Sequence, residues 1–153
     1  MEKIMHISGV LMDASEGGFF VLLEELEGER ALLIGIGPME ARSIWDALNG
    51  NFFFRPLTHD LIRNMLDSLK VSLKKVVVTK LENNVFYANM YLQKESGETV
   101  VMDSRPSDAI AIALRTKSPV YVNEEVLSQA GVPKENVKSL LSKEEGEEKK
   151  VIN

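Results

Sequence analysis

Three short stretches place acidic, basic or imidazole side chains beside a predicted helix start, at residues 35–40, 55–60 and 103–108. A helix N-terminus presents free N–H groups and a partial positive charge, so it can hold a phosphate or a carboxylate. In each stretch an acid already lies in the first helical turn, namely Glu40, Asp60 and Asp108. Each acid could satisfy only the helix dipole and the free donors, or it could belong to a site that spans several stretches.

Metal-assisted cleavage of phosphodiester bonds would use several of these side chains together. Such a reaction needs carboxylates that hold Mg²⁺ or Mn²⁺, a base or water-positioning group, and cationic donors to the phosphate. The candidate metal ligands are Asp60, Asp103, Asp108 and Glu124, and the candidate phosphate-binding residues are Arg55, Arg105 and Arg115. We predict catalytic roles for His59, Asp60 and Asp108, and we expect His59 to be half-exposed. A helix-capping or surface role for His59 is the alternative.

The sequence lacks the motifs of several other catalytic and nucleotide-binding sites. Gly35-Ile36-Gly37 follows a predicted strand and precedes a predicted helix, but the third glycine and the later acid of a dinucleotide loop are missing. There is no Gly-x-Ser-x-Gly nucleophile motif and no P-loop. Residue chemistry alone therefore does not fix a reaction.

The net charge and the cysteine count limit what the protein can bind and where it can work. The formal charge is −5, so the chain lacks the general attraction to phosphates on which passive nucleic-acid binders depend. A contact with nucleic acid must then be local or use a metal. There is no cysteine, which excludes disulfides and thiolate sites and fits a reducing compartment. The longest apolar run is Ala109 to Leu114, far below the ~20 residues that span a bilayer, so we expect a cytoplasmic protein with no membrane partner.

The predicted elements fall into two similar halves. In the first, three apolar segments broken by glycine turns predict a β-meander, and Pro38 begins a helix that ends at Asn49-Gly50. The second half repeats this plan, with a helix that begins at Pro106. The predicted strands are 5–13, 18–26 and 30–36, then 71–81, 85–94 and 98–103. Shifting the sequence by 68 residues aligns Pro38 with Pro106 and Glu40 with Asp108, which indicates either an internal duplication or convergent helix-start chemistry.

The helix after Pro106 differs from the other predicted helices because its residues 109–114 are apolar on every face. Such a helix is buried, so we expect it at the centre of the core. Further predicted elements are a helix at 58–69, a strand at 119–122 and helices at 124–131 and 133–141. We predict an α+β fold in which a mostly antiparallel sheet packs on the central helix, with one domain at 1–141 and a charged, flexible tail at 142–153. The open sheet edges favour a homo-oligomer.

Two strings resemble the signatures of the bifunctional nuclease domain family. They are Arg55-Pro56-Leu57-Thr58-His59-Asp60-Leu61 and the longer, more specific string from Asp103 to Arg115, and residues 119–125 resemble the segment that follows. The resemblance extends from the first meander to about Gly131. It implies a small α+β domain of bacteria, archaea and plants that cleaves both DNA and RNA with a divalent metal.

Two functions from different classes follow as hypotheses. The first is a metal-assisted nuclease with DNA and RNA as substrates, in which the candidate acids converge in a cleft that solvent can reach. The second is a non-catalytic, oligomeric interaction module, in which the same strings serve only the fold and Arg105 forms a buried ion pair with Asp108. Exposed, converging carboxylates would favour the nuclease, and acids buried against arginine would favour the module.

Overall fold

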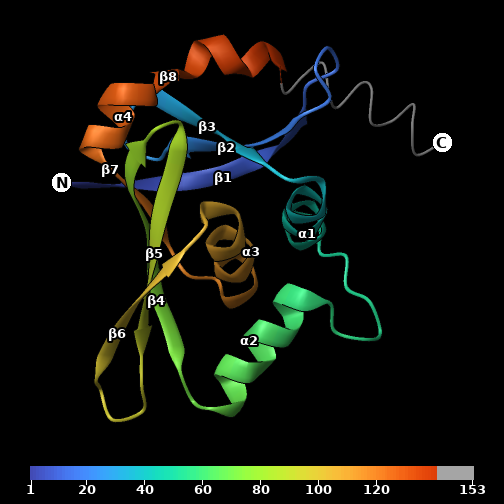
Figure 1. Ribbon diagram of the computed structural model, residues 1–153, viewed down its shortest axis with the longest axis vertical. Coiled ribbons are helices and arrows are strands. Elements are labelled where there is room, and N and C mark those ends of the chain that lie inside the picture. Colours follow the sequence, from blue (N-terminus) through green and yellow to red (C-terminus); the bar gives the residue numbers. More distant parts are fainter. Residues whose placement is uncertain (141–153) are drawn as a thin grey trace.

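The computed structural model describes residues 1–140, and the predicted charged tail lies outside the described residues. One sheet of eight strands has the order β6-β5-β4-β7-β1-β2-β3-β8 (Figure 1). The strands are β1 (Glu2–Met12), β2 (Phe19–Glu25), β3 (Arg30–Ile36), β4 (Ser72–Glu82), β5 (Val85–Gln93), β6 (Thr99–Ser104), β7 (Val120–Asn123) and β8 (Val132–Pro133). The helices are α1 (Pro38–Leu48), α2 (Thr58–Ser68), α3 (Pro106–Thr116) and α4 (Glu124–Ala130), and residues 134–140 are also helical.

The two predicted halves lie on either side of β7 in the sheet. β1, β2 and β3 form one antiparallel meander and β4, β5 and β6 form the other, and each is followed by a helix that begins at a proline. β7 pairs parallel to β4 and antiparallel to β1. The predicted α+β fold with a mostly antiparallel sheet is confirmed, and the internal duplication stays a prediction.

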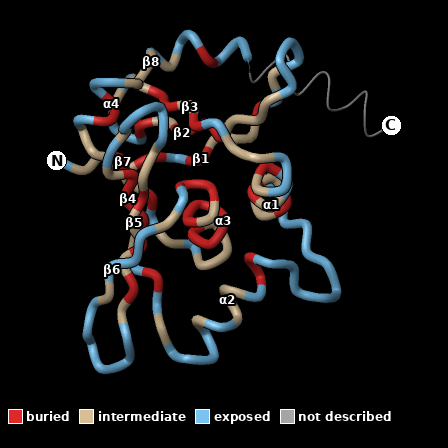
Figure 2. Tube along the Cα trace, viewed as in Figure 1, coloured by how far each residue is buried: buried red, intermediate tan, exposed pale blue. Residues whose placement is uncertain are grey.

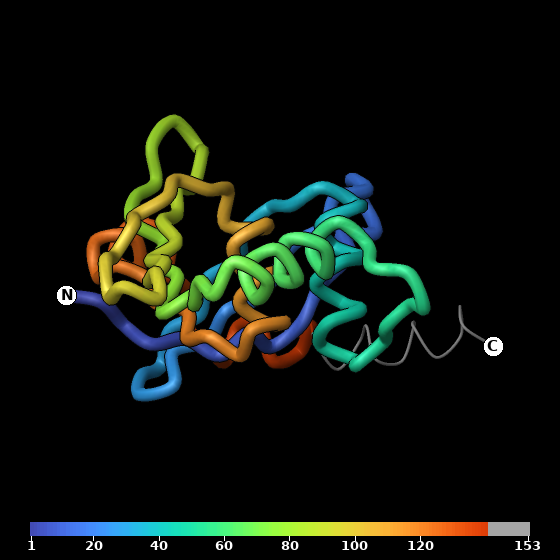
Figure 3. Tube along the Cα trace, turned by 90° about the horizontal axis from the view of Figure 1, so that it is seen from below, coloured from blue at the N-terminus to red at the C-terminus, as the bar shows by residue number. Residues whose placement is uncertain are grey.

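The helix α3 lies at the centre of the molecule, as its apolar sequence predicts. It contacts α1, α2, β4 and β5, and every residue from Ala109 to Ala113 is buried (Figure 2). In contrast, α2 lies at the surface: in the view from below it crosses the molecule with no other segment over it (Figure 3). None of the helices in residues 1–140 has the length and apolar character needed to cross a membrane.

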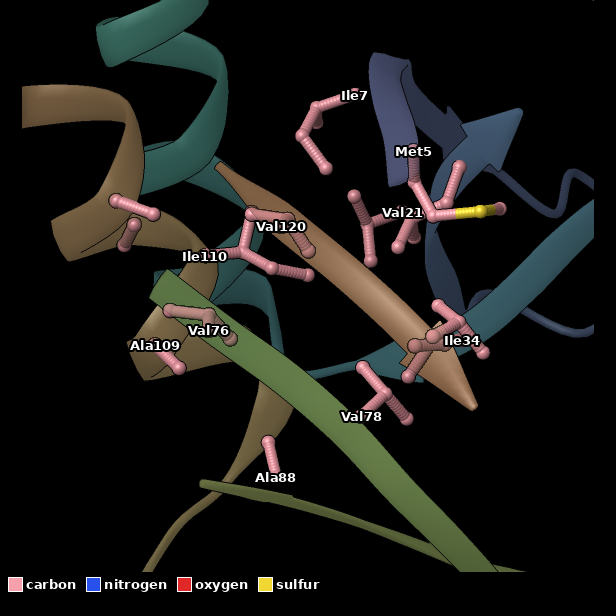
Figure 4. Packing of buried hydrophobic residues seen from close by; sticks show 14 of the residues in the cluster. Met5, Ile7, Val21, Ile34, Val76, Val78, Ala88, Ala109, Ile110 and Val120 are labelled. Carbon is pink, nitrogen blue, oxygen red and sulfur yellow. The ribbon is translucent and has the colours of Figure 1, made fainter. Parts of the chain in front are cut away.

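The main core is formed where α3 packs on the middle strands of the sheet. Figure 4 shows Ala109 and Ile110 of α3 beside Val76 of β4 and Val120 of β7, and all four side chains are buried. β-branched residues dominate these strands because they pack well on a pleated surface. A second, smaller cluster joins β1, β2 and β3 to Val137 of the C-terminal helical segment.

Two predicted boundaries are wrong, and the reason in each case is strand pairing over a long sequence distance. β1 begins at Glu2 rather than at residue 5 because Glu2 to Met5 pair with β7. Val132 and Pro133 form β8 on the edge of β3, so the helix predicted from Pro133 begins one residue later. Local sequence patterns do not contain this information.

Candidate functional site

Three helices meet around His59, whose two ring nitrogens are both hydrogen-bonded. Nδ1 lies 2.6 Å from Ser43 Oγ of α1, and Nε2 lies 2.9 Å from Asp108 Oδ1 of α3. An ionised carboxylate can only accept, so Nε2 carries a proton and donates it to Asp108. In the neutral ring, Nδ1 then accepts from the Ser43 hydroxyl. The imidazole therefore links α1, α2 and α3.

Ser43, His59 and Asp108 have the residue types of a hydrolytic triad, but Ser43 is poorly placed as a nucleophile. It lies inside α1, where the backbone N–H groups are used in helical hydrogen bonds. The helix therefore offers no free N–H beside the hydroxyl to stabilise an oxyanion. His59 is only 7% exposed because α1 and α3 cover it, so the predicted half-exposure is wrong. These observations favour a positioning role for Ser43 and His59.

Asp60, the next residue of α2, belongs to a separate buried ion pair. Its Oδ1 accepts from Arg115 Nε over 2.7 Å, and its Oδ2 accepts from the backbone N–H of Leu57. Arg115 also donates to the carbonyl oxygens of Ala111 and Ser43, and its side chain is 3% exposed. Burial raises the pKa of Asp60, but the bonds from Arg115 and Leu57 outweigh it and hold the pKa below its ordinary value. This arrangement commits Arg115 to the fold rather than to a phosphate in solvent.

The most exposed part of the network is formed by Glu40, Arg105 and Asp108. Arg105 NH2 lies 3.0 Å from Glu40 Oε1 and 2.8 Å from Asp108 Oδ2, and Arg105 Nε also donates to Asp108. The Arg105 side chain is 65% exposed, so solvent screens these pairs. Glu40 and Asp108 occupy the first turns of α1 and α3, and the convergence of these two helix starts brings both carboxylates to one nitrogen.

Asp108 is ionised at neutral pH. Burial raises its pKa, but hydrogen bonds from His59 and Arg105 outweigh burial and hold the pKa below the ordinary value. About a third of its side chain, 30%, is exposed. Asp108 is therefore a charged carboxylate held in one orientation and open to solvent on one side.

A pocket of about 520 Å³ lies beside this cluster. Arg105, Pro106 and Ser107 at the start of α3 form one part of its wall, and Gly37 at the start of α1 forms another. The remaining wall comes from the ends of β2 and β3 and from the turn between β4 and β5. It includes the aromatic residues Phe19, Phe20 and Phe86. The pocket thus combines a guanidinium and two helix N-termini with an apolar, partly aromatic wall.

The remaining predicted site residues do not join this cluster. Glu124 binds Arg30 through two bonds of 2.7 and 2.9 Å, and Arg30 also binds Glu25. Asp103 lies exposed on β6, where it is opposite Asn89 of β5. Arg55 is exposed in the loop before α2 and has no hydrogen-bonded or ionic partner among residues 1–140. In the same part of the chain no group of three or more His, Cys, Asp or Glu side chains could hold a metal ion.

Sequence reasoning missed Ser43, and it named Glu40 as a first-turn acid without including it among the candidate site residues. Glu40 could have been found, because shifting the sequence by 68 residues aligns it with Asp108, and in the structure both acids bind Arg105. Ser43 carries no such signal, since a serine inside a helix is ordinary and its partner is 16 residues away in another element.

Together, the fold and the site define an α+β domain in which the starts of two helices, each beginning at a proline, bring two acids to an arginine that lines a pocket. The chain belongs to the bifunctional nuclease domain family, whose sequence pattern matches residues 21–135. This match includes both signature strings and confirms the resemblance.

Relatives of known sequence agree with this membership. A protein of Mycobacterium tuberculosis described as uncharacterized is 39% identical over 128 residues, which cover 84% of this chain and 76% of that protein. Bifunctional nuclease 1 of Oryza sativa subsp. indica is 31% identical over 112 residues, which cover 71% of this chain and 34% of the rice protein. Bifunctional nuclease 1 of Arabidopsis thaliana is 33% identical over 104 residues, 65% of this chain and 32% of that protein. The chain thus matches about a third of the length of these plant nucleases.

Proposed function

We propose that this protein is a cytoplasmic nuclease that hydrolyses phosphodiester bonds of DNA and RNA at the pocket beside Arg105. Membership of the bifunctional nuclease domain family supports the reaction class. We choose this site because the carboxylates of Glu40 and Asp108 both bind the same nitrogen of Arg105, whose side chain is mostly exposed. Because the chain is acidic overall, a local cation beside a pocket is what a phosphate contact requires.

The metal ligands that the sequence predicted do not form one set, and we propose a smaller set of two carboxylates for Mg²⁺ or Mn²⁺. Mg²⁺ is usually held by one or two carboxylates, while substrate phosphates and water complete its octahedral shell. Glu40 and Asp108 supply two carboxylates whose oxygens both lie within 3.0 Å of the same Arg105 nitrogen. Arg105 would then occupy the cation position when no metal is bound. A divalent ion there would supply an activated water and neutralise charge on the phosphate.

The protein's own side chains have distinct roles in this proposal. Arg105 can swing to a phosphate because most of its side chain is in solvent. Arg55 lies outside this cluster, so it has no role at the pocket in this proposal. His59 holds Asp108 in one orientation, and Ser43 fixes the ring of His59. The aromatic wall of the pocket can stack a base without regard to its identity, since every base has a π-face. Tolerance of both DNA and RNA follows from contacts to phosphates and base faces rather than to base edges or the 2′-hydroxyl.

The test is cleavage of end-labelled single-stranded DNA and RNA by purified protein with Mg²⁺, with Mn²⁺ or with EDTA. We expect metal-dependent cleavage that falls at least about a hundredfold in Asp108→Asn and in Glu40→Gln. Glu124→Gln is the matched control, because Glu124 is bound to Arg30 and should leave the rate unchanged. Equal trace activity in the wild type and in Asp108→Asn would identify a contaminant and remove the proposal.

A second candidate function has its own structural support. Asp60 is buried against Arg115, as expected for an acid that serves the fold alone. The Arg105–Asp108 pair that this hypothesis expected is formed, but the expectation that it is buried is wrong, because the Arg105 side chain is mostly exposed. A non-catalytic interaction module would have the arrangement of Asp60 and Arg115. A folded wild-type protein that cleaves no DNA or RNA with either metal would select this candidate over the nuclease.

A further inference from the structure

The helix α2 is apolar on two sides, and only one of them is covered. Ile62 and Leu66 on its inner side pack against the main core. On the outer side, Leu61 and Met65 are four residues apart, so they form one row, and both are about half exposed. A helix that is apolar on two sides is normally buried on both. The outer row therefore lacks a cover within residues 1–140.

The uncovered surface extends beyond the helix at both ends. Leu57 precedes α2 and Leu69 follows it, and Phe52, Phe53 and Phe54 lie in the preceding loop. Phe54 is 97% exposed and Leu69 is 73% exposed. We call these seven side chains, from Phe52 to Leu69, the α2 surface. They expose on the order of 900 Å² together, close to the ~800 Å² that each partner contributes to a standard-size interface.

We propose that the α2 surface binds the same surface of a second copy of this chain. The other residues on the outer face of α2 are Thr58, Asn64 and Ser68, so this face has no charged residue, although 27% of the chain is charged. Depletion of charge and enrichment in Phe and Met are typical of the core of a protein interface. The cations nearby are Arg55, in the loop before α2, and Arg63, which is paired with Asp67 on the same helix, so a phosphate backbone would meet cations beside the row of Leu61 and Met65 but none on it. In a two-fold symmetric dimer, a residue near the axis lies opposite the same residue of the other copy. Charged residues in this row would therefore face like charges and repel them. An uncharged row avoids this repulsion.

The proposed contact also bears on the candidate site. The inner side of α2 carries His59 and Asp60, and α2 is otherwise held mainly by α3. A second copy would hold α2 between α3 and its own counterpart, so both sides of the helix would be packed. This inference does not depend on whether the protein is a nuclease.

The experiment measures the mass of the full chain in solution by sedimentation velocity and native mass spectrometry. We expect a wild-type dimer, and we expect Met65→Lys and Met65→Glu each to raise the dissociation constant at least about tenfold. Mixing these two variants should restore a one-to-one heterodimer, because opposite charges then face each other. If the two-fold axis passes near Leu61, one helical turn from Met65, then Leu61→Lys and Leu61→Glu should give the same results. Far-ultraviolet circular dichroism confirms that each variant is folded.

Val101→Lys is the matched control, since Val101 is a half-exposed apolar residue on the edge strand β6. It should leave the dimer intact. A monomeric wild type would overturn the proposal, and so would a dimer that Val101→Lys dissociates and the Met65 variants do not. If the wild type is monomeric and Met65→Glu weakens the binding of a single-stranded oligonucleotide, the α2 surface binds nucleic acid and the proposal fails.

Discussion

The Asp60 carboxylate accepts a hydrogen bond of 2.7 Å from Arg115 Nε, and both side chains are almost fully buried between α2 and α3. The other two nitrogens of Arg115 each donate to a carbonyl oxygen, that of Ala111 and that of Ser43. A buried ion pair stabilises a fold only when such additional bonds satisfy its other polar atoms. Here they do, and one guanidinium connects α1, α2 and α3.

Removal of the Asp60 charge should therefore destabilise the protein strongly. Asp60→Asn keeps the size of the side chain but leaves the Arg115 charge buried without a counterion. We expect the free energy of unfolding to fall by about 3 kcal/mol, measured by urea denaturation. Asp67→Asn is the control, because the exposed Arg63–Asp67 pair of the same helix should contribute less than about 0.5 kcal/mol. Similar losses in both variants would contradict a special role for the buried pair.

The same pair predicts how stability depends on pH. The folded state holds the pKa of Asp60 below its ordinary value of 3.8, so the contribution of Asp60 is fully present above that pH. It is lost as the pH falls through the depressed pKa, because the folded state must then accept a proton that it disfavours. Urea denaturation between about pH 6 and pH 3 should show a steeper loss in the wild type than in Asp60→Asn. Parallel curves would show that Asp60 titrates normally.

His59 should carry its proton on Nε2 whenever its ring is neutral. The ionised Asp108 can only accept at Nε2, and the Ser43 hydroxyl can donate to Nδ1. Long-range ¹H–¹⁵N correlation spectra distinguish the two tautomers directly. We expect the preference to weaken in Asp108→Ala, while Ser43→Ala should cost about 1 kcal/mol of stability by leaving Nδ1 without its donor. A wild-type ring protonated on Nδ1 would contradict the assigned hydrogen-bond directions.

The position of the Glu40 carboxylate can be tested without deleting its charge. A methyl group on Gly37 would overlap that carboxylate, which lies over the start of α1, and would push it away from Arg105. Gly37→Ala should therefore lower nuclease activity about as much as Glu40→Gln, with little change in the thermal midpoint. Gly35→Ala is the control in the same pocket, since its methyl group would meet only Phe20 at an ordinary 3.8 Å. Equal activity in both alanine variants would place Glu40 outside the site.

Local patterns were sufficient to predict most of the fold. Pro38 and Pro106 begin helices as predicted, because proline lacks the N–H that would be unpaired at a first helical position. The fully apolar run from Ala109 also predicted the central place of α3. The beginning of β1 and the strand β8 escaped prediction because each depends on a partner far away in the sequence.

The candidate site was less predictable, because its composition depends on which charges meet in three dimensions. His59, Asp108 and Arg105 lie in one network, as their two strings suggested. The residue types alone did not show that the Arg115 side chain points inward to Asp60. They also did not show that Glu124, at the start of α4, binds Arg30. The sequence does not show whether an Asp or Glu carboxylate binds a metal ion or an arginine. That depends on which side chains the fold brings next to the carboxylate.

The central place of β7 has a consequence for how the chain is made. β1 is synthesised well before one of its two neighbours in the sheet, β7, which consists of residues 120–123. Until β7 has been synthesised, the edge of β1 and the edge of β4 that pair with it have no partner in the nascent chain. Such edges invite pairing with other chains, and contacts between distant residues form slowly. During synthesis, this domain should therefore depend on chaperone protection until its last third has emerged.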